Sequence, residues 1–276
     1  MIRAVDTQAR GISPVPRLGN SSENRAPIMR MNTTLVINPK GGSGKTTVTT
    51  SLASYFAARS VPVTVMDYDP QGSSLNWLRL RDSFRNRIYA ANAAPQRGNR
   101  LRGIEMHVPT DTRQLIIDAP AGASGLLLQE MLARADCIVV PVAPSAIDIH
   151  ATANFIRDLL LAGRIRMRNI RLGVVANKVR NSMPTYEPLE RFLKSLSLPL
   201  LSRLRDSDVY LKAVESGLGL FEMDEATSES EREQFRPVAE WVEGPQSQLK
   251  SQQIGADRKI IQLPGRPRLL AGVVSN

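Results

Sequence analysis

The chain has 276 residues, of which 42% are hydrophobic, so it is long and apolar enough to bury a substantial core. Lysine and arginine outnumber aspartate and glutamate by 36 to 26, and the resulting net charge of +10 indicates a polyanionic partner. No apolar run is long enough to span a bilayer, and the single cysteine, Cys137, excludes a disulfide framework. A soluble, cytoplasmic protein is predicted.

The two ends of the chain lack the periodicity of helices and strands. Residues 1–30 contain Pro, Gly, Ser and Asn and are predicted to be a disordered extension. Residues 244–276 are predicted to be a flexible basic tail, in which Pro264 and Pro267 are incompatible with a long amphipathic helix. One domain, residues 31–243, is expected between them.

Short apolar strands alternate with helical stretches throughout this domain. The strands are expected at Thr34–Asn38, Val63–Met66, Leu115–Ile117, Cys137–Val142, Leu172–Ala176 and Leu198–Leu201. The helices are expected at 45–59, 72–82, 124–134, 146–161, 185–195, 206–216 and 229–242. Near-continuous apolar strands that alternate with helices predict a parallel sheet covered on both faces, which is a doubly wound α/β fold.

The first predicted strand runs into a glycine-rich loop that is followed by a helix. The loop reads Pro39-Lys40-Gly41-Gly42-Ser43-Gly44-Lys45-Thr46-Thr47. Glycines allow successive backbone N–H groups to surround phosphate oxygens, and the helix N-terminus adds its positive dipole. In this pattern Lys45 is predicted to reach the β- and γ-phosphates, and the Thr46 hydroxyl is predicted to bind Mg²⁺. The usual pattern has glycine where Pro39 stands, and this variant has a second lysine, Lys40.

Five segments together resemble the ParA/MinD family of ATPases. The segment KGGSGKTT resembles the deviant Walker A box of the family, in which the first lysine, Lys40, is the signature residue. In chain order, MDYDPQGSS (66–74) resembles its second acidic box, LIIDAPAG (115–122) its Walker B strand, VVANKVR (174–180) its adenine-reading segment and RLRDSDVYLKAVESGLGLFEM (203–223) its C-terminal stretch.

This resemblance implies an ATP site with assigned residues. The nucleotide-binding residues would be Lys40, Gly41, Gly42, Ser43, Gly44, Lys45, Thr46, Thr47 and, for the adenine, Asn177. Thr46, Asp67 and Asp118 would hold Mg²⁺, directly or through water, and Asp69 would position the attacking water. Family members form ATP-sandwiched homodimers, so Lys40 would reach the partner's phosphates and act there with Lys45. Hydrolysis is expected to be slow until an activating partner binds.

Basic and acidic residues are segregated along the domain. Residues 79–102 hold seven arginines and one acid, and residues 157–205 hold eleven basic and three acidic residues. Residues 206–243 reverse the balance, with three basic and eleven acidic residues. Such blocks indicate one side that faces a polyanion and one acidic side.

Arg203 and Arg205 stand where DNA-binding members of the family place basic residues. The arginines expected to accompany them are Arg164, Arg166, Arg168 and Arg171. Contacts to phosphate alone predict binding to double-stranded DNA that is independent of sequence and strongly dependent on salt.

A small ParA-type ATPase is the function that these features favour, one that binds nucleoid DNA as an ATP dimer and positions cargo. The cargo would be a plasmid, a chromosome origin or a protein assembly such as the carboxysome, as in McdA-type members, reached through a ParB-like or McdB-like adaptor. A MinD-like membrane-associated ATPase is an alternative, although the amphipathic anchor is missing. A biosynthetic ligase of the cobyrinate amidase or dethiobiotin synthetase type is a third, and it would need a small-substrate pocket.

Overall fold

A computed structural model describes four stretches of the chain, residues 30–95, 106–161, 169–180 and 187–244. The described residues from Met31 to Gly244 belong to one compact unit. The predicted disorder of the N-terminal extension and of the C-terminal tail concerns residues that lie almost entirely outside the described stretches, and it stays a prediction.

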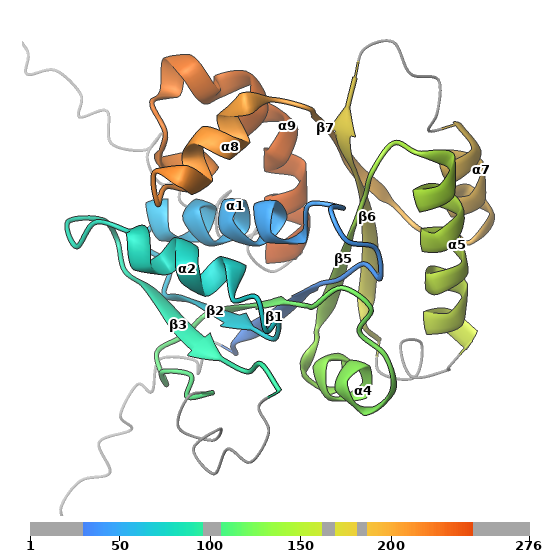
Figure 1. Cartoon of the computed structure of the whole chain (residues 1–276), viewed down its shortest axis with the longest axis horizontal. Helices are drawn as coiled ribbons and strands as arrows, with labels where there is room; N and C mark the ends of the chain where they lie inside the picture. Colours follow the sequence, from blue (N-terminus) through green and yellow to red (C-terminus); the bar gives the residue numbers. More distant parts are fainter. Residues whose placement is uncertain (1–29, 96–105, 162–168, 181–186, 245–276) are drawn as a thin grey trace, which may run out of the picture. The chain divides into compact units, whose positions relative to one another are not determined.

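Within these stretches, seven parallel strands form one sheet in the order β3-β2-β4-β1-β5-β6-β7 (Figure 1). The strands are β1 (Asn32–Val36), β2 (Val63–Asp67), β3 (Ile88–Asn92), β4 (Gln114–Asp118), β5 (Cys137–Val142), β6 (Arg171–Val179) and β7 (Leu200–Arg205). The helices are α1 (Lys45–Ala58), α2 (Ser73–Leu80), α4 (Gly125–Arg134), α5 (Ala146–Leu161), α7 (Glu187–Ser195), α8 (Asp208–Glu215), the 3₁₀ helix η2 (Leu220–Glu222) and α9 (Glu225–Glu243). The predicted doubly wound α/β fold is confirmed.

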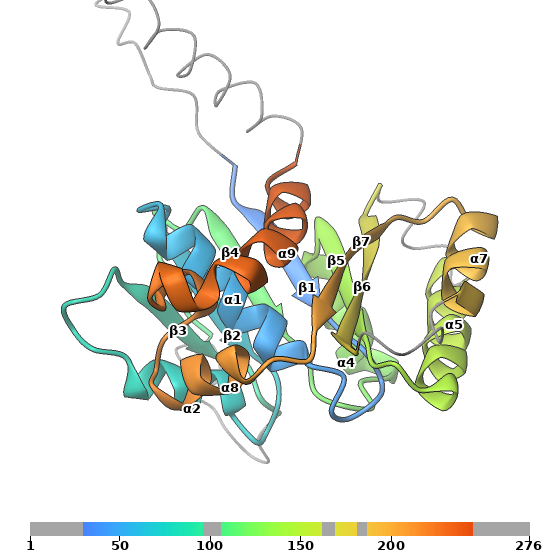
Figure 2. The same ribbon diagram turned by 90° about the horizontal axis from the view of Figure 1, so that it is seen from above.

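Helices cover both faces of the sheet, and each face has its own hydrophobic core (Figures 1 and 2). Leu35 of β1 belongs to the core closed by α4, α5 and α7, whereas its neighbour Val36 belongs to the core closed by α1, α2, α8, η2 and α9. The strands β2 and β5 are buried along their whole length, as expected when both faces of a sheet are covered. No helix in the described residues is both long and apolar enough to cross a membrane.

The edge strand β3 and the short 3₁₀ helix η2 are elements that the sequence did not predict. β3 shows why. Its sequence, IYAAN, directly follows an arginine-rich stretch, and only two of its five residues are buried. An edge strand has one neighbour and less apolar surface to bury, so its sequence pattern is weak.

Capping residues explain two predicted helix boundaries that were wrong. The helix predicted at 206–216 begins at Asp208, because the Ser207 hydroxyl accepts a hydrogen bond from the backbone N–H of Val209. The helix predicted at 229–242 begins at Glu225, because the Asp224 carboxylate accepts one from the N–H of Thr227.

The last strand also lies further along the chain than predicted. It was expected at Leu198–Leu201, but β7 runs from Leu200 to Arg205.

Candidate nucleotide-binding site

Three neighbouring strands end at the same edge of the sheet and bring the predicted site together. Asp67 and Asp118 are register partners at the carboxyl ends of β2 and β4, and Val36 of β1 pairs with Asp118. β1 then leads through the glycine-rich loop into α1 (Figure 1). Folds of this kind bind ligands outside the carboxyl ends of their strands, where the strand order reverses.

A buried asparagine holds the start of the loop. The Asn38 amide nitrogen donates to the Pro141 carbonyl oxygen at 2.7 Å and to the Thr152 hydroxyl at 3.0 Å, and its Oδ1 accepts from the Lys40 N–H at 2.9 Å. These bonds fasten the loop to β5 and α5. Sequence reasoning did not identify Asn38, although a polar residue at the end of an apolar strand must find partners when it is buried.

Two glycines give the loop a backbone that other residues adopt only under strain. Gly42 and Gly44 have φ angles of +75° and +93°. A Cβ atom on Gly44 would lie 1.9 Å from Nδ2 of Asn177, which is buried and donates to the Ser43 carbonyl oxygen at 2.9 Å. The asparagine expected to read adenine therefore lies against the phosphate loop, and its contact with adenine stays a prediction.

The two lysines of the loop have different surroundings. Lys45 is 8% exposed, and its ammonium donates to the Lys40 carbonyl oxygen at 3.1 Å. Burial lowers the pKa of Lys45, while the charges of Asp118 and Asp69 oppose that shift. The half-exposed Lys40 ammonium lies 3.7 Å from the carboxylate of Asp148, in the first turn of α5. Both ammonium groups thus border the loop.

The other two predicted loop residues complete the path into α1. Gly41 is exposed, and Thr47 lies half-buried in the first turn of the helix. A Cβ atom on Gly41 would meet nothing within 4 Å.

Two carboxylates and two hydroxyls meet beside the start of α1. The Thr46 hydroxyl donates to Asp118 Oδ2 at 3.0 Å. The Ser74 hydroxyl lies 2.8 Å from Asp67 Oδ2 and 2.9 Å from Asp118 Oδ2. Because a hydroxyl has one proton, Ser74 cannot donate to both carboxylates at once.

The donor set around Asp118 fits a magnesium ion. Asp118 is buried, and its Oδ1 has no hydrogen-bond partner within the described stretches. Burial, and after it the charge of Asp67, raise the pKa of Asp118 to about 7, and burial also raises the pKa of Asp67. A divalent cation would satisfy the unpaired oxygen and favour the ionised carboxylates.

The side chains at this site suit Mg²⁺, which takes part of its ligands from phosphate and water, better than a metal ion whose ligands all come from the protein. The described part of the chain contains no group of three or more His, Cys, Asp or Glu side chains that could hold a metal. Mg²⁺ is usually bound by one or two carboxylates, a hydroxyl, phosphate oxygens and water. Asp118, Asp67 and Thr46 therefore fit as its protein ligands.

Asp69 lies in the turn that connects β2 to α2. Its backbone N–H donates to Asp67 Oδ1 at 2.9 Å, and its own Oδ1 accepts from the Gln71 N–H at 2.9 Å. The carboxylate thus stabilises the turn, as short acidic side chains commonly do. Its predicted action on an attacking water stays a prediction.

Sequence reasoning missed two further polar residues of the site, Ser74 and Asp148. Ser74 lies in the first turn of α2 and Asp148 in the first turn of α5. Each follows the carboxyl end of a buried strand by a short turn, and that spacing is the signal that could have identified them.

Arg203 and Arg205, the first predicted DNA-contacting residues, both lie on β7. Arg203 forms an ion pair with Glu190 of α7, although 57% of its side chain is exposed. Arg205 donates to the Ser230 hydroxyl of α9 at 2.7 Å. The side chain of each arginine therefore contacts a neighbouring helix of the same chain.

Of the four other predicted arginines, the structure describes Arg171. Arg171 stacks on the Trp241 ring at 4.7 Å and donates to the Val242 carbonyl oxygen at 3.0 Å, so it fastens α9 to β6. The remaining three lie outside the described residues, and they are Arg164, Arg166 and Arg168.

Known proteins share both sequence and fold with this chain. It is 24% identical to the maintenance of carboxysome distribution protein A of Halothiobacillus neapolitanus over 196 residues, which cover 69% of this chain and 87% of that protein. It is 26% identical to a protein ParA of Rhizobium radiobacter over 157 residues, which cover 57% of this chain and 69% of that protein.

Solved structures show the same fold at low sequence identity. Apo McdA from Cyanothece superposes with a TM-score of 0.59 at 17% identity, over 78% of this chain and all of that one. The septum site-determining protein MinD of Pyrococcus horikoshii, complexed with Mg-ADP, has a TM-score of 0.57 at 18% identity, over 78% of this chain and 97% of that one.

The sequence pattern of one domain family covers the whole candidate site. The CobQ/CobB/MinD/ParA nucleotide binding domain matches residues 34–221, which include the glycine-rich loop, both carboxylates and Asn177. This match spans more than half of the sequence, and the chain belongs to the CobQ/CobB/MinD/ParA nucleotide-binding family.

Proposed function

We propose that this chain is a ParA-type ATPase that binds ATP and Mg²⁺ at the carboxyl ends of β1, β2 and β4. The observation that carries the proposal is the buried Asp118 Oδ1, which has no hydrogen-bond partner in the described residues and lies at the strand end beside the phosphate loop. A bound Mg²⁺ would supply that partner. Relatives named for ParA and for carboxysome distribution support the same class of protein.

Each residue of the site has a role that follows from its chemistry. Backbone N–H groups of the loop would bind the phosphates, and Lys45 would exchange the Lys40 carbonyl oxygen for a phosphate oxygen. Asp118, Asp67 and Thr46 would hold Mg²⁺, which neutralises charge on the transferred phosphoryl group. Asp69 would orient the attacking water, and Asn177 would contact the adenine.

Lys40 is the residue that we propose to act across a homodimer. Its ammonium forms an ion pair with Asp148 of the same chain. An ion pair that is half exposed contributes at most about 1 kcal/mol, so exchanging Asp148 for the partner's phosphates costs little. An ammonium in that position stabilises the negative charge of the transition state, as an arginine finger does. Turnover would remain slow until dimerisation and an activating partner complete the site.

DNA binding and cargo positioning form the second half of the proposal. The chain carries a net charge of +10, and Arg203 and Arg205 lie on β7, with Arg164, Arg166 and Arg168 as proposed companions. The ATP-bound homodimer would bind double-stranded DNA without sequence preference and would therefore associate with the nucleoid. A ParB-like or McdB-like adaptor would link it to cargo, and the relative named for carboxysome distribution supports a role in positioning cargo.

The experiment that tests this function measures binding to random-sequence duplex DNA with ATP, with ADP and without nucleotide, across a series of salt concentrations. We expect binding that requires ATP, weakens steeply with salt and is lost in Lys45→Ala and in Arg203→Ala/Arg205→Ala. The charge-matched control is Arg134→Ala/Arg236→Ala, which removes two exposed arginines of α4 and α9 that lie outside both arginine-rich blocks and should bind as the wild type does.

A wild-type protein that fails to bind DNA with ATP at low salt would contradict the DNA half of the proposal. Sedimentation with anionic liposomes would then test the MinD-like membrane alternative, for which ATP-dependent recruitment to lipid is the expected result.

A further inference from the structure

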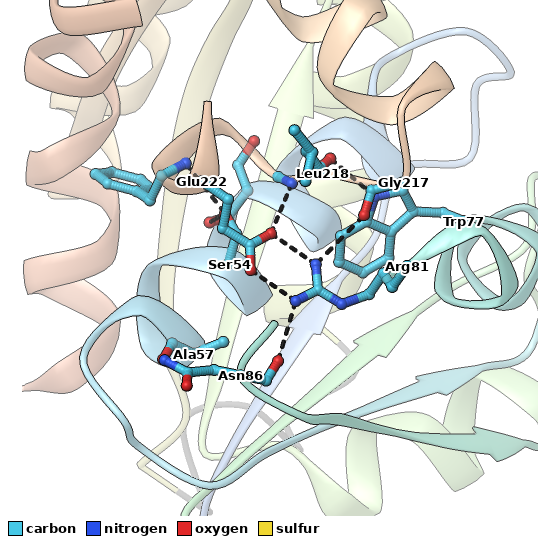
Figure 3. A network of polar contacts seen from close by, with 11 residues as sticks. Ser54, Ala57, Trp77, Arg81, Asn86, Gly217, Leu218 and Glu222 are labelled. Carbon is cyan, nitrogen blue, oxygen red and sulfur yellow. Dashed lines mark hydrogen bonds and ion pairs between the residues drawn. The ribbon is translucent and has the colours of Figure 1, made fainter. Parts of the chain in front are cut away.

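A buried ion pair connects the C-terminal end of α2 to η2. The Arg81 guanidinium and the Glu222 carboxylate form two parallel hydrogen bonds of 2.6 Å, and 6% of each side chain is exposed. Both residues make further hydrogen bonds, because Arg81 donates to the carbonyl oxygens of Gly217 (3.4 Å) and Asn86 (3.1 Å), and Glu222 accepts from the Gly219 N–H (2.9 Å) (Figure 3). A guanidinium and a carboxylate that match in this way fix both position and angle.

Trp77 provides a second connection between the same two segments. Its indole N–H donates to the Leu218 carbonyl oxygen at 2.9 Å, and the Arg81 guanidinium lies over its ring at 5.1 Å (Figure 3). A Cβ atom on Gly217 would lie 2.5 Å from the backbone carbonyl of Leu80, so the two segments approach closely. The C-terminal end of α2 is thus held against the turn that joins α8 to η2.

The opposite end of α2 lies in the proposed metal site. The Ser74 hydroxyl lies within hydrogen-bond distance of both the Asp67 and the Asp118 carboxylate, and the Leu75 N–H lies 3.3 Å from Asp67 Oδ2. The helix has eight residues and is therefore about 12 Å long, short enough to move as one rigid piece. A displacement at Arg81 would then reach Ser74.

The segment that contacts Arg81 also packs against α1, the helix that begins at the phosphate loop. The Phe221 N–H donates to the Ser54 hydroxyl at 3.3 Å, and Gly219 packs so closely that a Cβ atom there would lie 2.1 Å from Cβ of Ser54. The 3₁₀ helix therefore gives α2 a fixed reference point on the same helix that positions Lys45 and Thr46.

We infer that Arg81 and Glu222 are positioning residues that set where α2 places Ser74 against the Asp67 and Asp118 carboxylates. The inference rests on the proposed function in one respect, that these carboxylates hold Mg²⁺. Well-packed apolar residues commonly replace a buried ion pair without loss of stability, so stability alone does not account for this pair. The geometric effect of the pair is to hold α2 in one position relative to the metal site and to α1.

The decisive variant is Arg81→Met/Glu222→Leu, which replaces the pair with apolar side chains. Each single substitution leaves a buried charge without its partner and should lower the thermal midpoint, whereas the double substitution should recover most of it. If the pair positions α2, the double variant will regain thermal stability, but the arrangement of its metal site will remain disturbed. The control is Arg59→Met/Glu243→Leu, which removes a more exposed ion pair between Arg59, directly after α1, and Glu243 of α9 and leaves α2 untouched.

Two readouts separate a positioning role from a structural one. The first is hydrogen exchange of residues 67–76 in the protein without nucleotide, which should become about tenfold faster in the double variant and stay unchanged in the control. The second is the gain in ATP affinity on adding Mg²⁺, which should fall about tenfold or more, as happens when the groups behind metal ligands are changed. ATP affinity in the presence of a chelator should stay near that of the wild type.

Wild-type exchange at residues 67–76 together with a wild-type Mg²⁺ gain in the double variant would overturn the inference. Equal effects in the control would overturn it too. Should the double variant not fold, Arg81→Lys keeps the charge but loses the two-pronged geometry, and the same two readouts apply. A wild-type protein that shows no Mg²⁺ gain would contradict the proposed function instead, and the exchange measurement would still decide whether the pair positions α2.

Discussion

At the scale of single residues, Asp118 makes the stability of the protein depend on pH. Its pKa is about 7 in the folded chain against an ordinary value of 3.8, because it is buried next to Asp67. Between these two values the folded chain keeps a proton that the unfolded chain releases. The folded state therefore binds more protons, and the free energy of unfolding falls as the pH rises through this window.

This sign leads to a prediction for Asp118→Asn. Without nucleotide and Mg²⁺, urea unfolding should show the variant to be more stable than the wild type at pH 8, by an amount of the order of a few kcal/mol. The difference should shrink toward pH 4, and adding Mg²⁺ at pH 8 should stabilise the wild type alone. A difference between the two proteins that stays constant with pH would contradict the raised pKa.

Gly44 is a second residue whose substitution has a defined outcome. An alanine there would need a φ near +93° and would place its Cβ 1.9 Å from Asn177 Nδ2. We expect Gly44→Ala to lower the free energy of unfolding by about 2–4 kcal/mol. Gly41→Ala is the control, because nothing lies within 4 Å of that Cβ, and it should unfold within about 0.5 kcal/mol of the wild type.

The ion pair between Lys40 and Asp148 competes with the proposed dimer. Asp148→Asn removes the opposing charge but keeps an oxygen for the Ser145 hydroxyl, which donates to it at 2.6 Å. ATP-dependent dimerisation should strengthen by about twofold to fivefold, the effect of a pair worth up to about 1 kcal/mol. Sedimentation at graded protein concentrations measures this, with Lys40→Ala as the variant that should stay monomeric. A weaker dimer in Asp148→Asn would show that Asp148 supports Lys40.

At the scale of elements, the packing of η2 on α1 depends on a residue without a side chain. A Cβ atom on Gly219 would lie 2.1 Å from Ser54 Cβ and 2.9 Å from the Thr50 carbonyl oxygen. Gly219→Ala should therefore cost about 1–3 kcal/mol in urea unfolding, the range for overpacked cores. Unchanged stability would mean that η2 shifts freely on α1.

The elements that could be predicted from sequence are those whose pattern is local. Cys137–Val142 and 146–161 were predicted with the boundaries that β5 and α5 have, because a buried apolar run and a helix that follows a serine cap, here Ser145, each carry a local signal. The edge strand β3 carries little of that signal. β6 continues to Val179 past a register shift against β7, and no local pattern reveals such an irregularity.

The candidate site also has parts that could be predicted from the sequence and parts that could not. The glycine-rich loop and the carboxylates at strand ends are local patterns, so their proximity followed from a parallel sheet. The pairing of Arg81 with Glu222 joins residues that are 141 positions apart. Such a pair depends on how α2 and η2 pack, which sequence spacing does not contain.

At the scale of the whole molecule, the excess of basic residues predicts how binding to DNA responds to salt. Removing one interaction between an arginine and a DNA phosphate should reduce the slope of log affinity against log salt by about 0.9. Arg203→Gln/Arg205→Gln should therefore reduce the slope by about 2 if both arginines bind phosphate. A weaker affinity with an unchanged slope would mean that neither arginine binds phosphate.

The position of β1 in the sheet also governs how the chain assembles as it is made. β1 lies in the middle of the sheet, but Asn32 and Gln114 are 82 positions apart, and Thr34 and Cys137 are 103 positions apart. At ribosomal rates the first strand would wait about 5 to 20 s for β5 to be synthesised. For most of that interval, until β4 is synthesised, its apolar residues have no neighbouring strand to pair with, so the nascent chain is exposed to aggregation and to chaperones before the phosphate loop can form.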